Sequence, residues 1–191
     1  MDDFEGEQYG PICQALLTAA QTTELGPGTP NRQCRDQLGA LNTTTVFSGQ
    51  SIVDGDMAAC CESGLWLLHN YLDESHRISQ EIHSPTGSYW HGIMHRREPD
   101  FSNAKYWFRK VGEHPVFGSL FEAARKIAAT QPEDPAGSFL VGPERWNPAA
   151  FVDACETASD ERSMSSSICQ EIALAEWQLL FDYSFRLALG R

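Results

Sequence analysis

The chain has 191 residues, of which 41% are hydrophobic and 21% are charged, a composition typical of a folded globular protein. This length favours one domain with a single buried core. The net charge of −12 argues against polyanionic partners, which are nucleic acids and anionic membrane surfaces.

The N-terminus and the cysteines indicate in which cellular compartment the protein is expected. The chain has no apolar run of the roughly 20 residues that a membrane-spanning helix needs. Residues 1–8 (MDDFEGEQ) are acidic and lack the apolar core of a secretory signal. The six cysteines include no CxxC pair, so we expect buried, reduced thiols. These features predict a cytoplasmic protein with an acidic tail at 1–8, one domain at 9–191 and no membrane partner.

The first part of the chain predicts two helices and two irregular stretches. The spacing of apolar residues predicts helices at 13–22 and 33–41. The Gly- and Pro-rich residues 24–31 between them predict a loop. Residues 42–53 contain β-forming side chains but lack a partner strand, so we expect an extended linker.

The longest predicted helix runs from Met57 to about Ile82, with Asp54 as its N-cap. At 100° per residue its apolar side chains form a broad stripe, which indicates a central helix. The stripe consists of Gly64, Leu67, Leu68, Tyr71, Ile78 and Ile82.

The second half of the chain predicts further helices separated by Pro- and Gly-containing loops. They are expected from Ser88 to Arg97, from an N-cap at Ser102 to Val111, over 116–130, over 149–158 after Asn147-Pro148, and over 168–189. Gly112 is the expected C′ residue of the second of these helices, and a long loop covers 131–146. Strand signals are nearly absent. The predicted fold is therefore an all-α, single-domain helical bundle of seven to eight helices.

Histidines recur at regular intervals in the predicted long helix. His69, His76 and His83 are seven residues apart, and Glu62 precedes them at the same interval. On one continuous helix a seven-residue step drifts by only about 20°, so these four side chains would share a stripe. Asp73 lies beside that stripe.

The next predicted helix carries a second histidine pair. His91 and His95 are related as i and i+4, and Glu98 follows His91 by seven residues, so the three share one face. Two imidazoles and a carboxylate form a known type of site for a divalent transition metal, here Zn, Fe or Mn. Asp73 and His76 have the acid-x-x-His spacing of di-metal bundles. The predicted ligands are His91, His95, Glu98, His69, Asp73 and His76.

Two other interpretations of the histidines remain open. A histidine stripe opposite the core face is also typical of structural histidines that are solvated or hydrogen-bonded. Alternatively, His91, His95, Glu98 and His76 are predicted catalytic groups that act as metal-free acids and bases.

Basic and aromatic residues gather in the same region. Seven of the fourteen Lys and Arg residues lie between Arg96 and Lys126. Guanidinium groups bind carboxylate or phosphate well, which predicts a small anionic ligand beside the histidines. The predicted substrate-binding residues are Arg96, Arg97, Lys105, Arg109, Tyr89 and Trp90. The alternatives are ion pairs with the abundant acidic residues and aromatic side chains packed in the core.

The segment YWHGIMHRREPDFSNAKYWFRKVGEHPVF, residues 89–117, resembles a segment, YWHxIxHRREPDxxNAKYWFR, of a group of uncharacterised bacterial and fungal proteins. The resemblance covers under a fifth of the chain and implies no activity. Separately, DFSNAKYWFRKV, residues 100–111, is similar to one helix of the Sel1-like and tetratricopeptide repeats. No second copy is present, so we expect an isolated helix with that packing pattern.

Two classes of function follow from these patterns. The first is a small all-α enzyme, either metal-dependent or acid–base, that hydrolyses a small anionic substrate or uses oxygen. The second is a non-catalytic helical adaptor whose aromatic and basic face binds an acidic peptide or a partner helix.

Overall fold

The computed structural model describes residues 6–20, 24–47, 49–160 and 166–191, and within these ranges all regular secondary structure is helical. The all-α prediction is therefore confirmed. The α-helices are α1 (Pro11–Ala19), α2 (Arg35–Gly39), α3 (Thr43–Val46), α4 (Gly55–Leu68), α5 (Leu72–Ser79), α6 (Pro85–Arg97), α7 (Phe101–Val111), α8 (Val116–Thr130), α9 (Pro148–Asp160) and α10 (Ser166–Ala188). Short 3-10 helices cover Gly6–Tyr9, Arg32–Cys34 and Pro135–Leu140.

The predicted long helix is split in two, which accounts for one of the additional helices. α4 ends at Leu68, and Asn70 adopts the left-handed conformation, with φ 64°. Asparagine tolerates this conformation better than most residues, and here its side-chain amide donates to the Thr29 carbonyl at 2.9 Å. The chain therefore turns at Asn70 before it enters α5, and the prediction of one continuous helix was wrong.

Side-chain caps explain where several helices begin. Asp54 accepts from the backbone N–H of Met57, as predicted, and Asn147 accepts from the first amides of α9. α6 begins earlier than predicted because Ser84 is its cap and Pro85 its first residue. α7 is capped by Asp100 rather than by Ser102. Serine and aspartate are both common N-caps, and proline is common at the first helical position. The sequence alone therefore does not decide which residue begins α6 or α7.

Two segments that were expected to be irregular contain helical turns. Residues 43–46 form α3, whose capping box pairs Asn42 with Thr45, so the extended-linker prediction was wrong there. Part of the predicted loop after α8 is the 3-10 helix Pro135–Leu140. Residues 1–5 of the predicted acidic tail lie outside the described residues, and its last three residues belong to the 3-10 helix Gly6–Tyr9.

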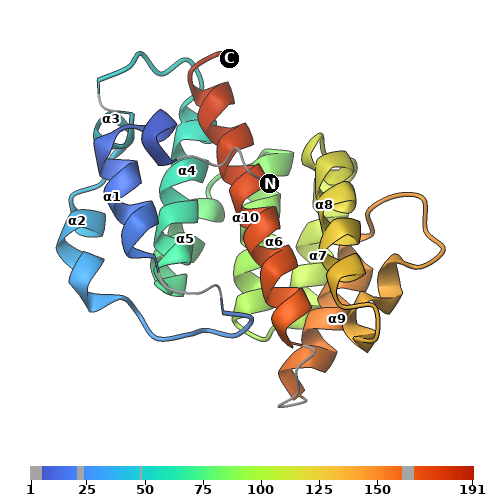
Figure 1. Ribbon diagram of the computed structural model, residues 1–191. Helices are drawn as coiled ribbons and strands as arrows, with labels where there is room; N and C mark the ends of the chain where they lie inside the picture. Colours follow the sequence, from blue (N-terminus) through green and yellow to red (C-terminus); the bar gives the residue numbers. More distant parts are fainter. Residues whose placement is uncertain (1–5, 21–23, 48, 161–165) are drawn as a thin grey trace.

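The helices pack around α10 and α4 in one bundle (Figure 1). α10 contacts α4, α8 and α9, and α4 also contacts α3, α5 and α6. α1 to α3 lie on one side of α10, and α7 to α9 lie on the other. The predicted central position of the helix after Asp54 is confirmed for α4.

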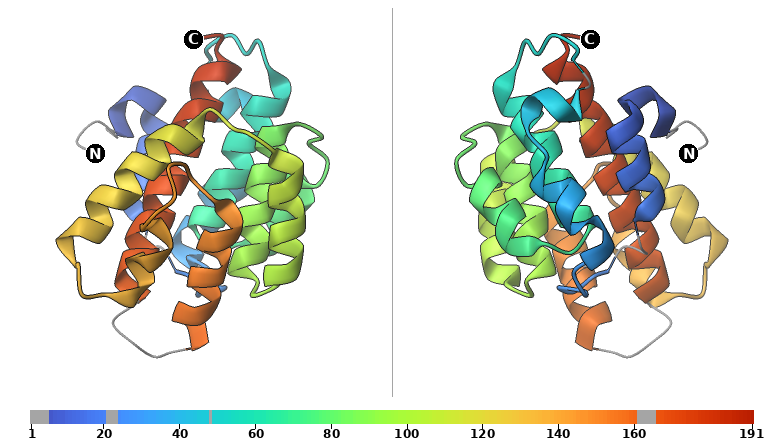
Figure 2. Two further views of the ribbon diagram at one scale, coloured as in Figure 1. Left: turned by 90° about the vertical axis from the view of Figure 1, so that its right-hand side faces the viewer. Right: turned by 90° about the vertical axis from the view of Figure 1, so that its left-hand side faces the viewer.

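α6 and α7 pack closely against each other, and they run side by side in both views of Figure 2. α5 packs against the other side of α6. The closeness of α4 and α6 depends on Gly64, where an added Cβ would lie 2.8 Å from the Trp90 ring. α6 is therefore the helix that contacts both α5 and α7.

Two further findings concern the whole chain. All six cysteines are buried and free. Among the described residues, none of the helices combines the length and the apolar character that crossing a membrane requires.

Candidate metal centre

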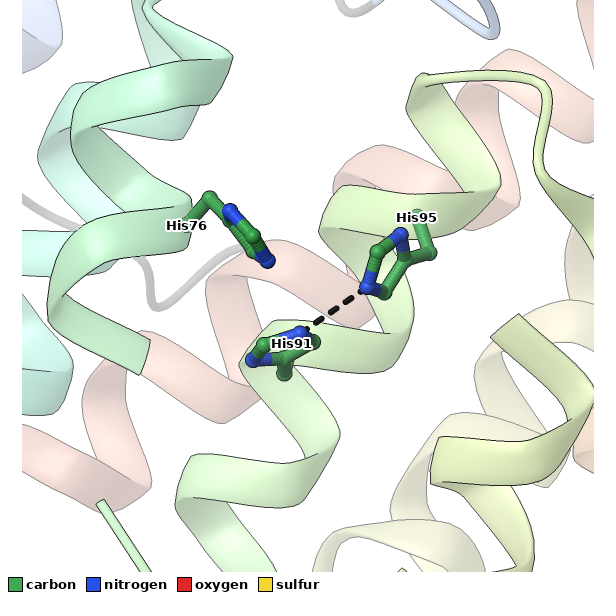
Figure 3. Close-up of side chains that lie close together, drawn as sticks. All are labelled: His76, His91 and His95. Atoms are coloured by element: carbon green, nitrogen blue, oxygen red, sulfur yellow. Dashed lines mark hydrogen bonds between the residues drawn. The ribbon is translucent and has the colours of Figure 1, made fainter. Parts of the chain in front are cut away.

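Three histidines converge between α5 and α6. The rings of His91 and His95, on α6, face the ring of His76, on α5 (Figure 3). One ring nitrogen from each residue lies within 4.8 Å of the other two. The closest pair is Nε2 of His91 and Nε2 of His95, at 2.9 Å. This group could hold a metal ion.

The geometry of one helix explains why two of the three histidines lie close together. The packing of a second helix explains the position of the third. His91 and His95 are one turn apart on α6 and therefore share a face. His76 lies in the last turn of α5, whose direction is set by the turn at Asn70. The packing of α5 on α6 then brings the His76 ring centroid to 4.8 Å from that of His91 and to 5.3 Å from that of His95.

Hydrogen-bond partners hold the second nitrogens of the α6 histidines. Glu98 Oε2 lies 3.1 Å from Nδ1 of His95, and Ser79 Oγ lies 3.4 Å from Nδ1 of His91. Histidines that bind metals in proteins usually have such a partner on the other ring nitrogen, because it fixes the tautomer. With Nδ1 engaged on both rings, Nε2 remains as the nitrogen that each ring presents to an ion.

One face of α7 covers the same histidines. Trp107 stacks on the His91 ring, with centroids 4.0 Å apart, and Lys110 Nζ lies 4.3 Å from the Trp107 ring centroid. The amide nitrogen of Asn103 lies 3.1 Å from Nε2 of His95 and 3.4 Å from its Nδ1. We call Asn103, Trp107 and Lys110 the α7 stripe, since they are related as i, i+4 and i+7.

Burial keeps the α6 imidazoles neutral. Desolvation, together with His95 and His76, lowers the pKa of His91 to about 3. Desolvation also lowers the pKa of His95, although the carboxylate of Glu98 opposes that shift. At neutral pH each ring therefore carries only one proton, and an ion bound by both Nε2 atoms would displace the one proton that these two nitrogens share in their 2.9 Å hydrogen bond.

The other predicted ligands lie outside this group. His69 is buried at the end of α4, with Nδ1 3.2 Å from the Asn31 amide, and Asp73 is exposed. The predicted stripe is broken at Asn70, which leaves His83 exposed beyond the end of α5. Glu98 contacts His95 on the nitrogen that does not face His91, so its role is that of a hydrogen-bond partner and not a ligand. The third member of the group is thus His76, which was among the predicted ligands, and not the carboxylate of Glu98.

Two of the three arginines predicted to bind substrate make structural contacts instead. Arg96 is only 2% exposed and forms a buried ion pair with Glu176 of α10, with its guanidinium 4.6 Å from the Phe151 ring. Arg97 donates to the Gly26 carbonyl at 2.7 Å and to the Asn70 side chain at 2.5 Å. Both guanidinium groups are used inside the protein, which corrects the prediction of an arginine-lined ligand site.

The remaining predicted substrate residues are also engaged elsewhere. Tyr89 and Trp90 are fully buried, and they donate to Glu176 at 3.0 Å and to Ser184 at 3.3 Å, so they belong to the core. Lys105 pairs with Asp153 of α9. Arg109 is exposed and lies 5.9 Å from the Tyr106 ring centroid. The alternative interpretations describe four of the predicted residues: ion pairing describes Arg96 and Lys105, and core packing describes Tyr89 and Trp90.

Sequence reasoning missed the α7 stripe and Ser79. The i, i+4, i+7 spacing of Asn103, Trp107 and Lys110 is visible in the sequence, but spacing alone does not tell which neighbouring helix this face contacts. Only the packing of α7 on α6 shows that this face covers the histidines. Comparison of the chain with protein-family models, with curated proteins and with solved structures gave no match.

Proposed function

We propose that this protein is a zinc-dependent hydrolase of small anionic substrates, with His76, His91 and His95 as the metal ligands. The observation that carries the proposal is the convergence of three ring nitrogens within 4.8 Å. Three histidines with a fourth position left for water or substrate are a ligand set of catalytic zinc. Iron sites of the two-histidine type require a carboxylate ligand, and Glu98 is turned to the wrong nitrogen for that role.

The spacing of the nitrogens supports a single ion. Two nitrogens that bind one tetrahedral zinc ion at about 2.0–2.1 Å lie roughly 3.3 Å from each other. The Nε2 atoms of His91 and His95 are 2.9 Å apart, so a small rotation of the rings is sufficient for them. His76 requires a larger adjustment, and its half-buried position near the surface leaves room for one.

The protein groups around the ion have distinct roles in this proposal. A bound zinc ion supplies a Lewis acid that makes water a nucleophile near neutral pH. Glu98 holds the proton of His95 on Nδ1 and thereby keeps Nε2 unprotonated, so that its lone pair can bind the ion. The half-exposed Glu98 and His76 lie at the edge of the centre, through which a small substrate reaches it.

Metal binding is tested with the purified protein. We expect one zinc ion per chain after equilibration with zinc and removal of excess, and its loss in His91→Asn and in His95→Asn. The control is His83→Asn, which alters an exposed histidine outside the group and leaves zinc binding unchanged. Circular dichroism of each variant verifies that the fold is retained. Wild-type protein that takes up no zinc at neutral pH would refute the centre.

Catalysis is tested separately from binding. The zinc-loaded and the chelator-treated protein are compared on a panel of carboxylic and phosphoric esters, and we expect turnover by the zinc-loaded form alone. A stoichiometric zinc ion without hydrolysis of any ester would reduce the centre to a structural site. The adaptor alternative predicts instead that an acidic peptide or a partner helix binds equally well with and without metal.

A further inference from the structure

The α7 stripe has a chemical character that metal binding alone does not explain. Metal ligation by the three histidines does not require an amide donor, an indole face and an ammonium group to lie along one side of the centre. Asn103 and Trp107 are half-buried against the rings, whereas Lys110 is exposed at the outer end of the stripe. The stripe therefore leads from the histidines to solvent.

Lys110 differs in its surroundings from Arg96, Arg97 and Lys105. Arg96 and Lys105 have carboxylate partners, and Arg97 is bonded to backbone carbonyls and to Asn70. No carboxylate pairs with Lys110 within the described part of the chain. Its ammonium group is instead held over the rings of Trp107 and Tyr106, at 4.3 Å and 5.0 Å from their centroids.

The acidic residues of the same region are already engaged. Glu98 contacts Nδ1 of His95, and Asp100 caps the start of α7. Their charge alone would repel an anion from the centre, so an anionic substrate needs an opposing cation close by. Lys110 lies close to the histidines, because its ammonium group is 4.3 Å from the centroid of the Trp107 ring, and that ring stacks on His91 with centroids 4.0 Å apart.

We propose that the α7 stripe is an oxyanion subsite, in which Lys110 and the Asn103 amide hold a carboxylate or phosphate group beside the three-histidine centre. Trp107 stacks on His91 and keeps Lys110 in place through the cation–π contact. The inference rests on the proposed function and names the residues that select its substrate class. Lys110 and Asn103 thus take the anion-binding role that was predicted for the arginines.

The test uses the full chain loaded with Co²⁺, whose visible spectrum responds to the ligands of the ion. The protein is titrated in parallel with acetate and with methyl phosphate, which separates the two sources of an oxyanion. We expect Lys110→Gln to weaken binding of the preferred anion about tenfold, as the loss of one charge-assisted hydrogen bond predicts. The matched control, Lys126→Gln, removes an exposed cation on α8 and leaves anion binding unchanged.

Asn103→Ala gives a second, independent result. We expect weaker anion binding at saturating Co²⁺, a condition that removes any effect of the lost contact between the amide and Nε2 of His95 on Co²⁺ affinity. Anion binding equal to that of the wild type under this condition would overturn the assignment of Asn103. A Co²⁺-loaded Lys110→Gln protein with wild-type anion affinity would refute the subsite alone. A wild-type chain that binds no Co²⁺ would refute the proposed function together with the subsite.

Discussion

At the scale of single residues, the conformation of Asn70 decides which histidines meet. Its positive φ ends α4 and redirects the chain, so His69 and His76 do not share a helix face although they are seven residues apart. Arg97 holds this conformation in place through the Asn70 side chain. A spacing rule for continuous helices therefore fails at this point, while it holds for His91 and His95 within α6.

Replacing Glu98 tests how the centre is tuned at this scale. We expect Glu98→Gln to weaken zinc binding by about 10–100-fold, because the carboxylate that fixes the His95 tautomer is lost. Competition with a chromophoric chelator measures the affinity. Glu81→Gln, an exposed acid at the end of α5, is the control. Equal affinities of the two variants would show that the contact at 3.1 Å does not orient the ring.

His114 makes the stability of the fold depend on pH. Its Nε2 lies 3.2 Å from Thr86 Oγ1, its Nδ1 accepts from the Val116 amide, and burial lowers its pKa to about 4. In the unfolded chain the histidine pKa is about 6.5, so between these values only the unfolded state binds the proton. The contribution of His114 to the free energy of unfolding is thus complete above about pH 6.5 and decreases as the pH falls toward 4.

The size and origin of this pH effect can be measured by urea unfolding at several pH values. The His114 contribution amounts to on the order of 3 kcal/mol at about pH 4. We expect His114→Gln to make the pH dependence of unfolding less steep, with the remainder due to the buried His91 and His95, and the exposed His83→Gln serves as the control. A slope that is identical in wild type and His114→Gln would contradict the prediction.

At the scale of helices, α6 is fixed to α10 by a buried polar cluster. Glu176 accepts from Tyr89 at 3.0 Å and pairs with Arg96, and all three side chains are almost completely buried. Buried ion pairs contribute little net stability, but removing one partner leaves an uncompensated charge in the core. This cluster positions the face of α6 that carries the histidines toward α5 and α7.

Breaking this cluster is expected to be costly. Arg96→Met should destabilise the fold by about 3–5 kcal/mol, because the Glu176 carboxylate loses its counter-charge. The double variant Arg96→Met/Glu176→Leu should recover most of that loss, since no buried charge then remains. Lys105→Met, which breaks a more exposed pair with Asp153, should cost at most about 1 kcal/mol. Chemical denaturation compares the three, and a double variant no more stable than Arg96→Met would contradict the explanation.

At the scale of the whole molecule, the proposed zinc ion would tie two helices together. His76 comes from α5 and the other two ligands from α6, and these helices are separated by the turn before Pro85. An ion that binds only the folded chain stabilises it by mass action. Zinc at a hundred times its dissociation constant should add about 2.7 kcal/mol to the free energy of unfolding.

Thermal unfolding with and without zinc measures this stabilisation. We expect the midpoint to rise with the zinc concentration in the wild type and in His83→Asn, and to stay constant in His91→Asn. Adding a chelator should reverse the rise. A rise of equal size in His91→Asn would show that zinc binds elsewhere on the chain.

Composition and local spacing by themselves determined the all-α fold, most helix positions and the shared face of His91 and His95. These features depend on contacts within one or two turns of a helix, which residue spacing encodes directly. Only the tertiary structure decided that His76 is the third member of the group, that Arg96 and Arg97 are internal, and that the α7 stripe covers the centre. The physical reason is that the relative placement of helices depends on turn conformations such as that of Asn70 and on packing between distant segments. Neither of these has a periodic signature in the chain.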